Sequence, residues 1–245
     1  MGEEKKKKVY AIALDLLYPR QCPLCQRIAG YGRLLCSDCE KEVPYLEEPF
    51  CMKCGKPFSI EEEAKEYCRD CQLHKRSFIR NYGLLRYESK VKKSIYAFKY
   101  ANKREYADWY VRELVKRYGT LWKSFQIDGI IPVPVHKKKR RKRGYNQAEI
   151  LGRKLGELLE IPCISKGLER TVDTTPQKEL DHKQRYKNLK SAFSIGHIPE
   201  EVHIVLLVDD IYTTGATMEA CSSLLLEQTT IEKVYACSIS VGNGL

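Results

Sequence analysis

The sequence contains no apolar run that approaches the roughly 20 residues needed for a membrane-spanning helix. It also has no export signal, because the apolar stretch after Lys5–Lys8 is interrupted by Asp15 and no A-x-A-like cleavage site follows. These two absences predict a cytoplasmic protein without a membrane span. Hydrophobic residues nevertheless make up 43% of the chain, which excludes a disordered protein.

Charge is distributed unevenly along the chain. The formal net charge is +11, and the excess of lysine and arginine lies between residues 81 and 190. Residues 191–245 are acidic by contrast. The middle of the chain is therefore expected to attract anions.

A change of composition near residue 78 predicts two domains. Residues 1–78 are rich in cysteine and turn residues, after a short helix at 9–18, and residues 79–245 alternate between strand and helix patterns. Such alternation predicts a doubly wound α/β sheet with ligands at the carboxyl ends of its strands. Residues 171–190 are polar and aperiodic, which indicates a loop. The expected strands are 80–87, 127–135, 161–170, 202–208 and 233–240, and the expected helices are 89–99, 103–118, 145–160 and 215–229.

Eight of the 11 cysteines form four C-x-x-C pairs, which can be grouped into two Cys₄ sites in three ways. Such pairs aim thiolates at a tetrahedral ion, and without an export signal metal binding is favoured over disulfides. Two structural zinc ions would replace the hydrophobic core that roughly 55 residues cannot build. An iron–sulfur cluster and thiol redox chemistry are the alternatives. The proposed ligands are Cys22, Cys25, Cys36, Cys39, Cys51, Cys54, Cys68 and Cys71, whereas Cys163, Cys221 and Cys237 are expected in the core.

The most specific signal is the stretch VLLVDDIYTTGAT at residues 205–217. An apolar strand ends in two carboxylates, and a turn rich in hydroxyl groups leads into a helix. Backbone N–H groups at a helix N-terminus can hold a phosphate, and Gly215 allows the backbone to approach it closely. Asp209 and Asp210 can accept hydrogen bonds from sugar hydroxyls or hold a hydrated Mg²⁺. The stretch suits a sugar 5-phosphate, and it is neither a Walker A loop nor a G-x-G-x-x-G turn.

Seven consecutive cations, KKKRRKR at residues 137–143, follow the expected strand ending in PVPVH. They exceed what one pyrophosphate can use and predict salt-dependent nucleic-acid binding, with a solvated surface loop as the alternative. Nearby aromatic residues at helical spacing either stack on bases or belong to the core. The nucleic-acid-binding candidates are Lys137, Lys138, Lys139, Arg140, Arg141, Lys142 and Arg143, and the aromatic residues are Tyr96, Tyr100, Tyr106, Trp109 and Tyr110.

The acidic and threonine-rich stretch resembles the phosphoribosyl pyrophosphate (PRPP) signature of type I phosphoribosyltransferases. Together with Phe98–Tyr100, Pro132–His136, RGYNQA at 143–148 and the cysteine pairs, it makes the chain similar to the ComF family of competence proteins, in particular its ComFC-like members. The resemblance implies a type I phosphoribosyltransferase-like sheet behind a small double zinc ribbon.

The resemblance also implies roles for individual residues around PRPP and Mg²⁺. Asp209 and Asp210 would meet the ribose hydroxyls, and the turn would wrap the 5-phosphate through Thr213, Thr214, Gly215, Ala216 and Thr217. Pyrophosphate-loop candidates are Val135, His136 and Arg143, with Lys99 as a further phosphate ligand or a surface lysine. The loop at 171–190 would close over PRPP or remain a surface loop, with Arg170, Lys178, Lys183 and Arg185 as screening cations.

The family implies a cytoplasmic role in natural transformation, in which incoming single-stranded DNA is handled with a partner helicase. Two other functions stay open: a phosphoribosyltransferase of nucleotide salvage, and a zinc-ribbon adaptor with a vestigial pocket. No residue stands out as a general base. Related phosphoribosyltransferases hold the acceptor base beneath a small covering segment, called the hood. No hood is expected after the last strand, so any hood must come from residues 1–125. The sequence therefore leaves the acceptor, and turnover itself, undecided.

Overall fold

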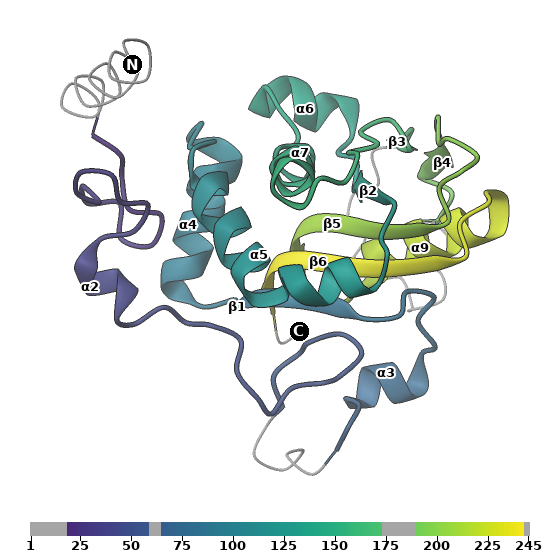
Figure 1. Ribbon diagram of the computed structural model, residues 1–245, viewed down its shortest axis with the longest axis horizontal. Coiled ribbons are helices and arrows are strands. Elements are labelled where there is room, and N and C mark those ends of the chain that lie inside the picture. The colour runs from purple at the N-terminus through teal and green to yellow at the C-terminus, as the bar shows by residue number, and fades with distance from the viewer. Residues whose placement is uncertain (1–18, 59–64, 173–189, 243–245) are drawn as a thin grey trace.

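The computed structural model of the chain describes residues 19–58, 65–172 and 190–242. Its cysteine-rich segment runs along one side of an α/β body built around a parallel sheet (Figure 1). The helix expected at 9–18 lies outside the described residues, as does most of the loop expected at 171–190. The domain boundary near residue 78 stays a prediction.

The central sheet consists of four parallel strands in the order β1-β6-β5-β2. Their carboxyl ends therefore meet at one edge, and four of the five expected strands are confirmed. The strand expected at 161–170 is reduced to two pieces. Cys163 forms an isolated parallel bridge with Ile130, and residues 168–170 pair with a strand that the sequence did not reveal. The strands are β1 (Asn81–Arg86), β2 (Gly129–Pro132), β5 (Ile204–Tyr212) and β6 (Lys233–Val241), with β3 (Leu168–Arg170) and β4 (Phe193–Ile195) as an antiparallel pair.

Strand β5 is buried on both faces, which explains its continuous apolar sequence. Leu206 and Val208 belong to one hydrophobic cluster, and Val205 and Leu207 belong to the other. The strand therefore places its next residues, the acidic pair, at the carboxyl edge of the sheet.

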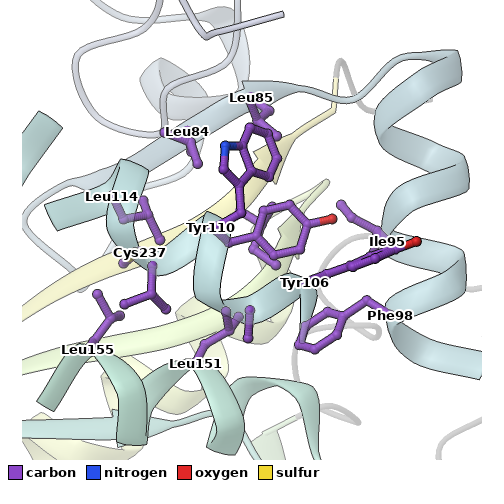
Figure 2. Packing of buried hydrophobic residues seen from close by; sticks show 14 of the residues in the cluster. Leu84, Leu85, Ile95, Phe98, Tyr106, Tyr110, Leu114, Leu151, Leu155 and Cys237 are labelled. Atoms are coloured by element: carbon purple, nitrogen blue, oxygen red, sulfur yellow. The ribbon is translucent and has the colours of Figure 1, made fainter. Parts of the chain in front are cut away.

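Helices cover both faces of the sheet, which confirms the predicted doubly wound α/β arrangement. Side chains of α4, α5 and α7 meet strand residues in the first cluster (Figure 2), and α9 packs in the second. All four helices were expected from their 3.6-residue apolar periodicity or their position in the alternation. Their bounds are α4 (Ser89–Tyr100), α5 (Tyr106–Ser124), α7 (Gln147–Leu159) and α9 (Ala216–Gln228).

The basic run is a helix, α6 (Lys137–Arg143), and not the loop expected after β2. His136 caps its start, because its Nδ1 accepts a hydrogen bond from the Lys138 N–H at 3.3 Å. Gly144 ends it with a left-handed φ of 81°. Lysine and arginine are good helix formers, and an ion pair of 3.2 Å between Arg140 and Glu149 of α7 offsets part of the repulsion. The sequence analysis missed this helix because the run has no apolar periodicity.

The cysteine-rich segment covers the edge strand β1. The Leu46 N–H donates to the Leu84 carbonyl at 2.9 Å, and the Arg86 N–H donates to the Pro44 carbonyl at 3.0 Å. These bonds satisfy backbone groups that an exposed edge would leave unpaired. The segment contains two short helices, α2 (Ser37–Glu40) and α3 (Arg69–Leu73).

Candidate metal centres and phosphate-binding site

The eight paired cysteines converge on two clusters in sequential grouping: Cys22, Cys25, Cys36 and Cys39 in the first, and Cys51, Cys54, Cys68 and Cys71 in the second. Within each cluster the sulfur atoms lie within 4.8 Å of one another. The Cys25–Cys36 and Cys54–Cys68 Sγ–Sγ distances are 3.6 and 3.7 Å. A tetrahedral zinc ion with Zn–S bonds of about 2.3 Å holds its sulfurs about 3.8 Å apart, whereas disulfide sulfurs are about 2 Å apart. The geometry therefore suits two Cys₄ zinc sites.

The two clusters repeat one local arrangement. In each, a short helix begins directly after the third cysteine and places an aspartate between the third and the fourth. An arginine pairs with that aspartate: Arg27 Nη2 lies 3.0 Å from Asp38 Oδ2, and Arg76 Nη2 lies 2.5 Å from Asp70 Oδ2. The first pair is exposed to solvent, whereas Arg76 is buried.

The predicted acidic pair lies at the carboxyl end of β5, next to the end of α4. Lys99 Nζ is 2.8 Å from Asp210 Oδ1, and both side chains are largely buried. Asp209 Oδ1 accepts a hydrogen bond of 2.8 Å from the Asp210 N–H. Lys99 is therefore not a surface lysine but the counter-ion of the acidic pair, and its expected role as a phosphate ligand stays a prediction.

Burial and mutual repulsion set the protonation of this pair. Burial raises the pKa of Asp209 to about 7, the Asp210 carboxylate adds to the increase, and Lys99 opposes it. Burial disfavours the charged form of Lys99, but the two carboxylates outweigh it and raise the Lys99 pKa. Near neutral pH the site therefore holds one ion pair and a second carboxyl group poised to ionise.

The threonine-rich turn follows directly and opens into α9. Gly215 has a φ of 75°, and a Cβ atom there would lie 2.0 Å from Tyr212 Oη, so only glycine fits. Thr213 and Thr214 are exposed, and the Thr214 hydroxyl accepts a hydrogen bond from the Ala216 N–H at 3.4 Å. Exposed hydroxyls at the N-terminus of a 13-residue helix form a suitable environment for a phosphate.

The RGYNQA motif fixes the end of α4 beside the end of β2. Asn146 Nδ2 donates to the Val133 carbonyl at 3.0 Å, and the Tyr145 hydroxyl donates to the Phe98 carbonyl. Gln147 Nε2 donates to the Lys99 carbonyl at 3.5 Å. The motif thus positions the backbone that carries Lys99.

Arg143, predicted on the pyrophosphate side, lies near Lys99. Its guanidinium donates to Tyr100 Oη at 2.7 Å and to Gln147 Oε1 at 2.9 Å, and its charge acts on Lys99. The sequence analysis did not identify Tyr100 and Gln147 as its partners, although both lie in motifs that it quoted. Arg170 is near enough to lower the pKa of Asp209.

The remaining predicted residues lie next to the site or outside the described part of the chain. His136 serves as the cap of α6, and Val135 lies in the irregular stretch between β2 and α6. Ala216 and Thr217 begin α9 beside the turn. Lys178, Lys183 and Arg185 lie outside the described residues.

Fold and site together define a double zinc ribbon joined to a parallel α/β sheet with an acidic, threonine-rich strand end. The family model described as "Double zinc ribbon domain" matches residues 13–72. Competence protein F of Haemophilus influenzae is 31% identical to the chain over 196 residues, which cover 78% of this chain and 83% of that protein. The chain therefore belongs to the competence protein F family, as its motifs indicated.

More distant relatives carry related names. Competence protein ComFC of Bacillus subtilis is 26% identical and is covered to 78%, with 79% of this chain aligned. DNA utilization protein YhgH of Escherichia coli K12 is 27% identical and is covered to 92%, with 86% of this chain aligned. Adenine phosphoribosyltransferase from Leishmania tarentolae is similar in structure with a TM-score of 0.37 and 15% identity, over 59% of this chain and 74% of that one. This last similarity is too low to support a statement about activity.

In the part of the chain that the structure describes, every helix is too short or too polar to cross a membrane.

We expect two equivalents of zinc per chain and one equivalent after Cys39→Ser or Cys54→Ser, because each substitution opens one Cys₄ shell. Elemental analysis of the purified protein measures this directly. Cys163→Ser is the matched control, since Cys163 is outside both clusters and should leave two equivalents. Retention of both ions by either cluster variant, or iron in place of zinc, would contradict the assignment.

We expect Asp209→Asn to raise the melting temperature more at pH 8 than at pH 5. The pKa of Asp209 is about 7 in the fold and about 3.9 in an unfolded chain. The folded state therefore holds the proton longer, and this group makes wild-type stability fall as the pH rises from about 4 to 7. The amide has no such proton to lose.

Asp210→Asn is the control, because it should lower the stability of the fold where Asp209→Asn raises it. It leaves the Lys99 ammonium without its partner, and we expect a loss of about 2 kcal/mol at pH 8. Thermal unfolding of both variants at the two pH values is the measurement. Equal effects of the two substitutions would show that the ion pair does not distinguish the two carboxylates.

Proposed function

We propose that the protein acts in competence and DNA uptake, in the cytoplasm, and that it binds PRPP with Mg²⁺ at the carboxyl end of β5. The names of its relatives support the first part, since they refer to competence and to DNA utilization. The family resemblance adds a helicase as a partner in handling single-stranded DNA. The local chemistry of the site supports the second part.

The observation that carries the ligand proposal is an acidic pair directly before an exposed hydroxyl-rich turn. In the proposed complex the 5-phosphate lies against Thr213, Thr214 and the start of α9, where the helix dipole favours an anion. The ribose hydroxyls then face Asp209 and Asp210, because the turn sets the distance between the 5-phosphate and these carboxylates. Bound Mg²⁺ would supply charge neutralisation for the diphosphate, with the same carboxylates as its nearest oxygen ligands.

Three cations on neighbouring elements suit the diphosphate end of the ligand. Lys99 on α4, Arg143 at the end of α6 and Arg170 at the end of β3 all act electrostatically on the acidic pair or on one another. A diphosphate needs several donors around one short segment, and planar guanidinium groups bind phosphate oxygens in pairs. The arrangement therefore supports an anion site beside the acidic pair.

The structure sorts the aromatic residues into two groups that bear on DNA binding. Tyr106, Trp109 and Tyr110 are buried in the core. Tyr96 and Tyr100 are 65% and 49% exposed, and their ring centroids lie 4.9 Å apart on the surface of α4.

This exposed tyrosine pair adjoins the basic helix α6. The Arg143 guanidinium lies 4.7 Å from the centre of the Tyr100 ring. Cations that follow a phosphate backbone beside aromatic rings that stack on bases are the usual elements of single-strand binding. We therefore assign single-stranded DNA to the surface formed by α6, Tyr96 and Tyr100.

The variant Asp209→Asn/Asp210→Asn should lose PRPP affinity by about 100-fold, or about 2.7 kcal/mol. Isothermal titration calorimetry with PRPP and Mg²⁺ measures the loss, and circular dichroism checks the fold. The control is Glu200→Gln/Glu201→Gln. These two glutamates are also consecutive in the sequence, but they are exposed and precede β5 instead of ending it. Unchanged affinity in the first variant would refute the site.

Replacing Lys137–Lys142 by glutamine, with Arg143 kept, should flatten the salt dependence of single-stranded DNA binding. The slope of log K against log salt should decrease in size by about 0.7 for each phosphate that the variant no longer neutralises. Arg140→Lys/Arg141→Lys is the charge-preserving control and should retain the slope.

Tyr96→Ala separates stacking from charge in the same assay. It should weaken binding by about 10-fold and leave the salt slope unchanged. If the glutamine variant keeps the wild-type slope, the DNA surface lies elsewhere.

A further inference from the structure

Arg76 connects the second cysteine cluster to the phosphate-binding turn. Its side chain is buried, with a relative exposure of 5% for the residue. Nη2 lies 2.5 Å from Asp70 Oδ2 and donates to the Thr214 carbonyl at 3.2 Å. Asp70 stands between Cys68 and Cys71 on α3, so one guanidinium group joins the metal-binding helix to the turn.

The next residue makes a second connection to the same region. The Ser77 N–H donates to Glu219 Oε2 at 2.7 Å, and the Ser77 hydroxyl donates to Glu219 Oε1 at 2.6 Å. Glu219 is buried in the first turn of α9, and its N–H donates to the Gly215 carbonyl at 2.8 Å. Residues 76 and 77 therefore hold the turn at Thr214 and the helix start at Glu219.

The packing beneath the turn also comes from the segment after the second cluster, through Phe78. The Phe78 ring meets the Tyr212 ring edge-on at 6.2 Å between centroids. The Tyr212 ring in turn lies directly under Gly215, where a Cβ would meet it. Three consecutive residues after the second cluster thus contact the strand end, the turn and the helix that make up the phosphate site.

The first cluster offers an internal comparison. Its aspartate, Asp38, corresponds to Asp70, but its partner Arg27 follows the second cysteine of the cluster, whereas Arg76 follows the fourth. The Arg27 and Asp38 side chains are both 67% exposed, and an exposed pair of this kind adds little to stability. The corresponding aspartate therefore forms a surface ion pair at the first metal site, and at the second it pairs with a buried arginine.

We propose that the second zinc site positions the phosphate-binding turn through Arg76, so that metal occupancy at Cys51, Cys54, Cys68 and Cys71 controls affinity for the phosphorylated ligand. The effect on affinity rests on the proposed function, whereas the ordering of the turn does not. Zinc fixes α3, α3 fixes Asp70, and Asp70 holds Arg76 against the Thr214 carbonyl. Arg76 is a positioning residue, since it reaches the ligand only through the backbone of the turn.

Hydrogen–deuterium exchange on the ligand-free, full-length protein tests the ordering. In Arg76→Ala the amides of residues 213–219 should exchange at least about tenfold faster than in wild type. Arg27→Ala should leave them unchanged. Ser77→Ala removes only a hydroxyl, so it should give a smaller increase in a protein that is otherwise intact. Wild-type protection of the turn in both Arg76→Ala and Ser77→Ala would overturn the proposal.

Calorimetry with PRPP and Mg²⁺ tests the consequence for binding. Cys68→Ser and Arg76→Ala should each weaken affinity about tenfold or more, whereas Cys36→Ser, at the corresponding position of the first cluster, should leave it near the wild-type value. If wild type binds PRPP and all three variants bind equally well, the proposed control by the second site is wrong. If wild type does not bind PRPP, the proposed function fails, and the exchange experiment alone decides the connection.

Discussion

The ion pair between Lys99 and Asp210 joins the end of α4 to the end of β5. Two adjacent carboxylates in a largely buried position repel each other, and the neighbouring ammonium is what allows one of them to remain ionised. The pair also fixes the spacing between the cationic and the acidic sides of the site. The RGYNQA motif holds the backbone of α4 at this place, and the apolar strand β5 delivers the acidic residues to it.

The threonine-rich turn at residues 213–217 is held from the other side of the site. Residues 76–78 leave the second cysteine cluster and contact Thr214, Glu219 and Tyr212. One half of the site is thus fixed by the helices on the sheet and the other half by the metal-binding segment. Under the proposal made above, this division gives the zinc ribbon a role at the ligand site in addition to replacing a hydrophobic core.

The sequence alone predicted those features that are determined by local sequence patterns. Apolar periodicity predicted three of the four long helices, and the alternation of strands and helices predicted α9. The strand–carboxylate–threonine order placed Asp209 and the turn at a strand end. The partner of Lys99 could not be predicted, because 111 positions separate it from Asp210 and no local pattern records which face of α4 meets β5. The burial of Arg76 could not be predicted for the same reason. In the sequence it is an arginine after a cysteine pair, which is typical of a surface cation, and only the fold shows that it is buried. The three possible groupings of the cysteine pairs were likewise separable only by distance.

The central claim is that this strand end binds a phosphorylated pentose. A crystal structure of the protein with PRPP and Mg²⁺ tests it most directly. The account predicts the 5-phosphate against residues 213–217, the ribose hydroxyls beside Asp209 and Asp210, and the diphosphate toward Lys99 and Arg143. A ligand bound elsewhere, or a turn that stays covered by protein at saturating PRPP, would contradict it.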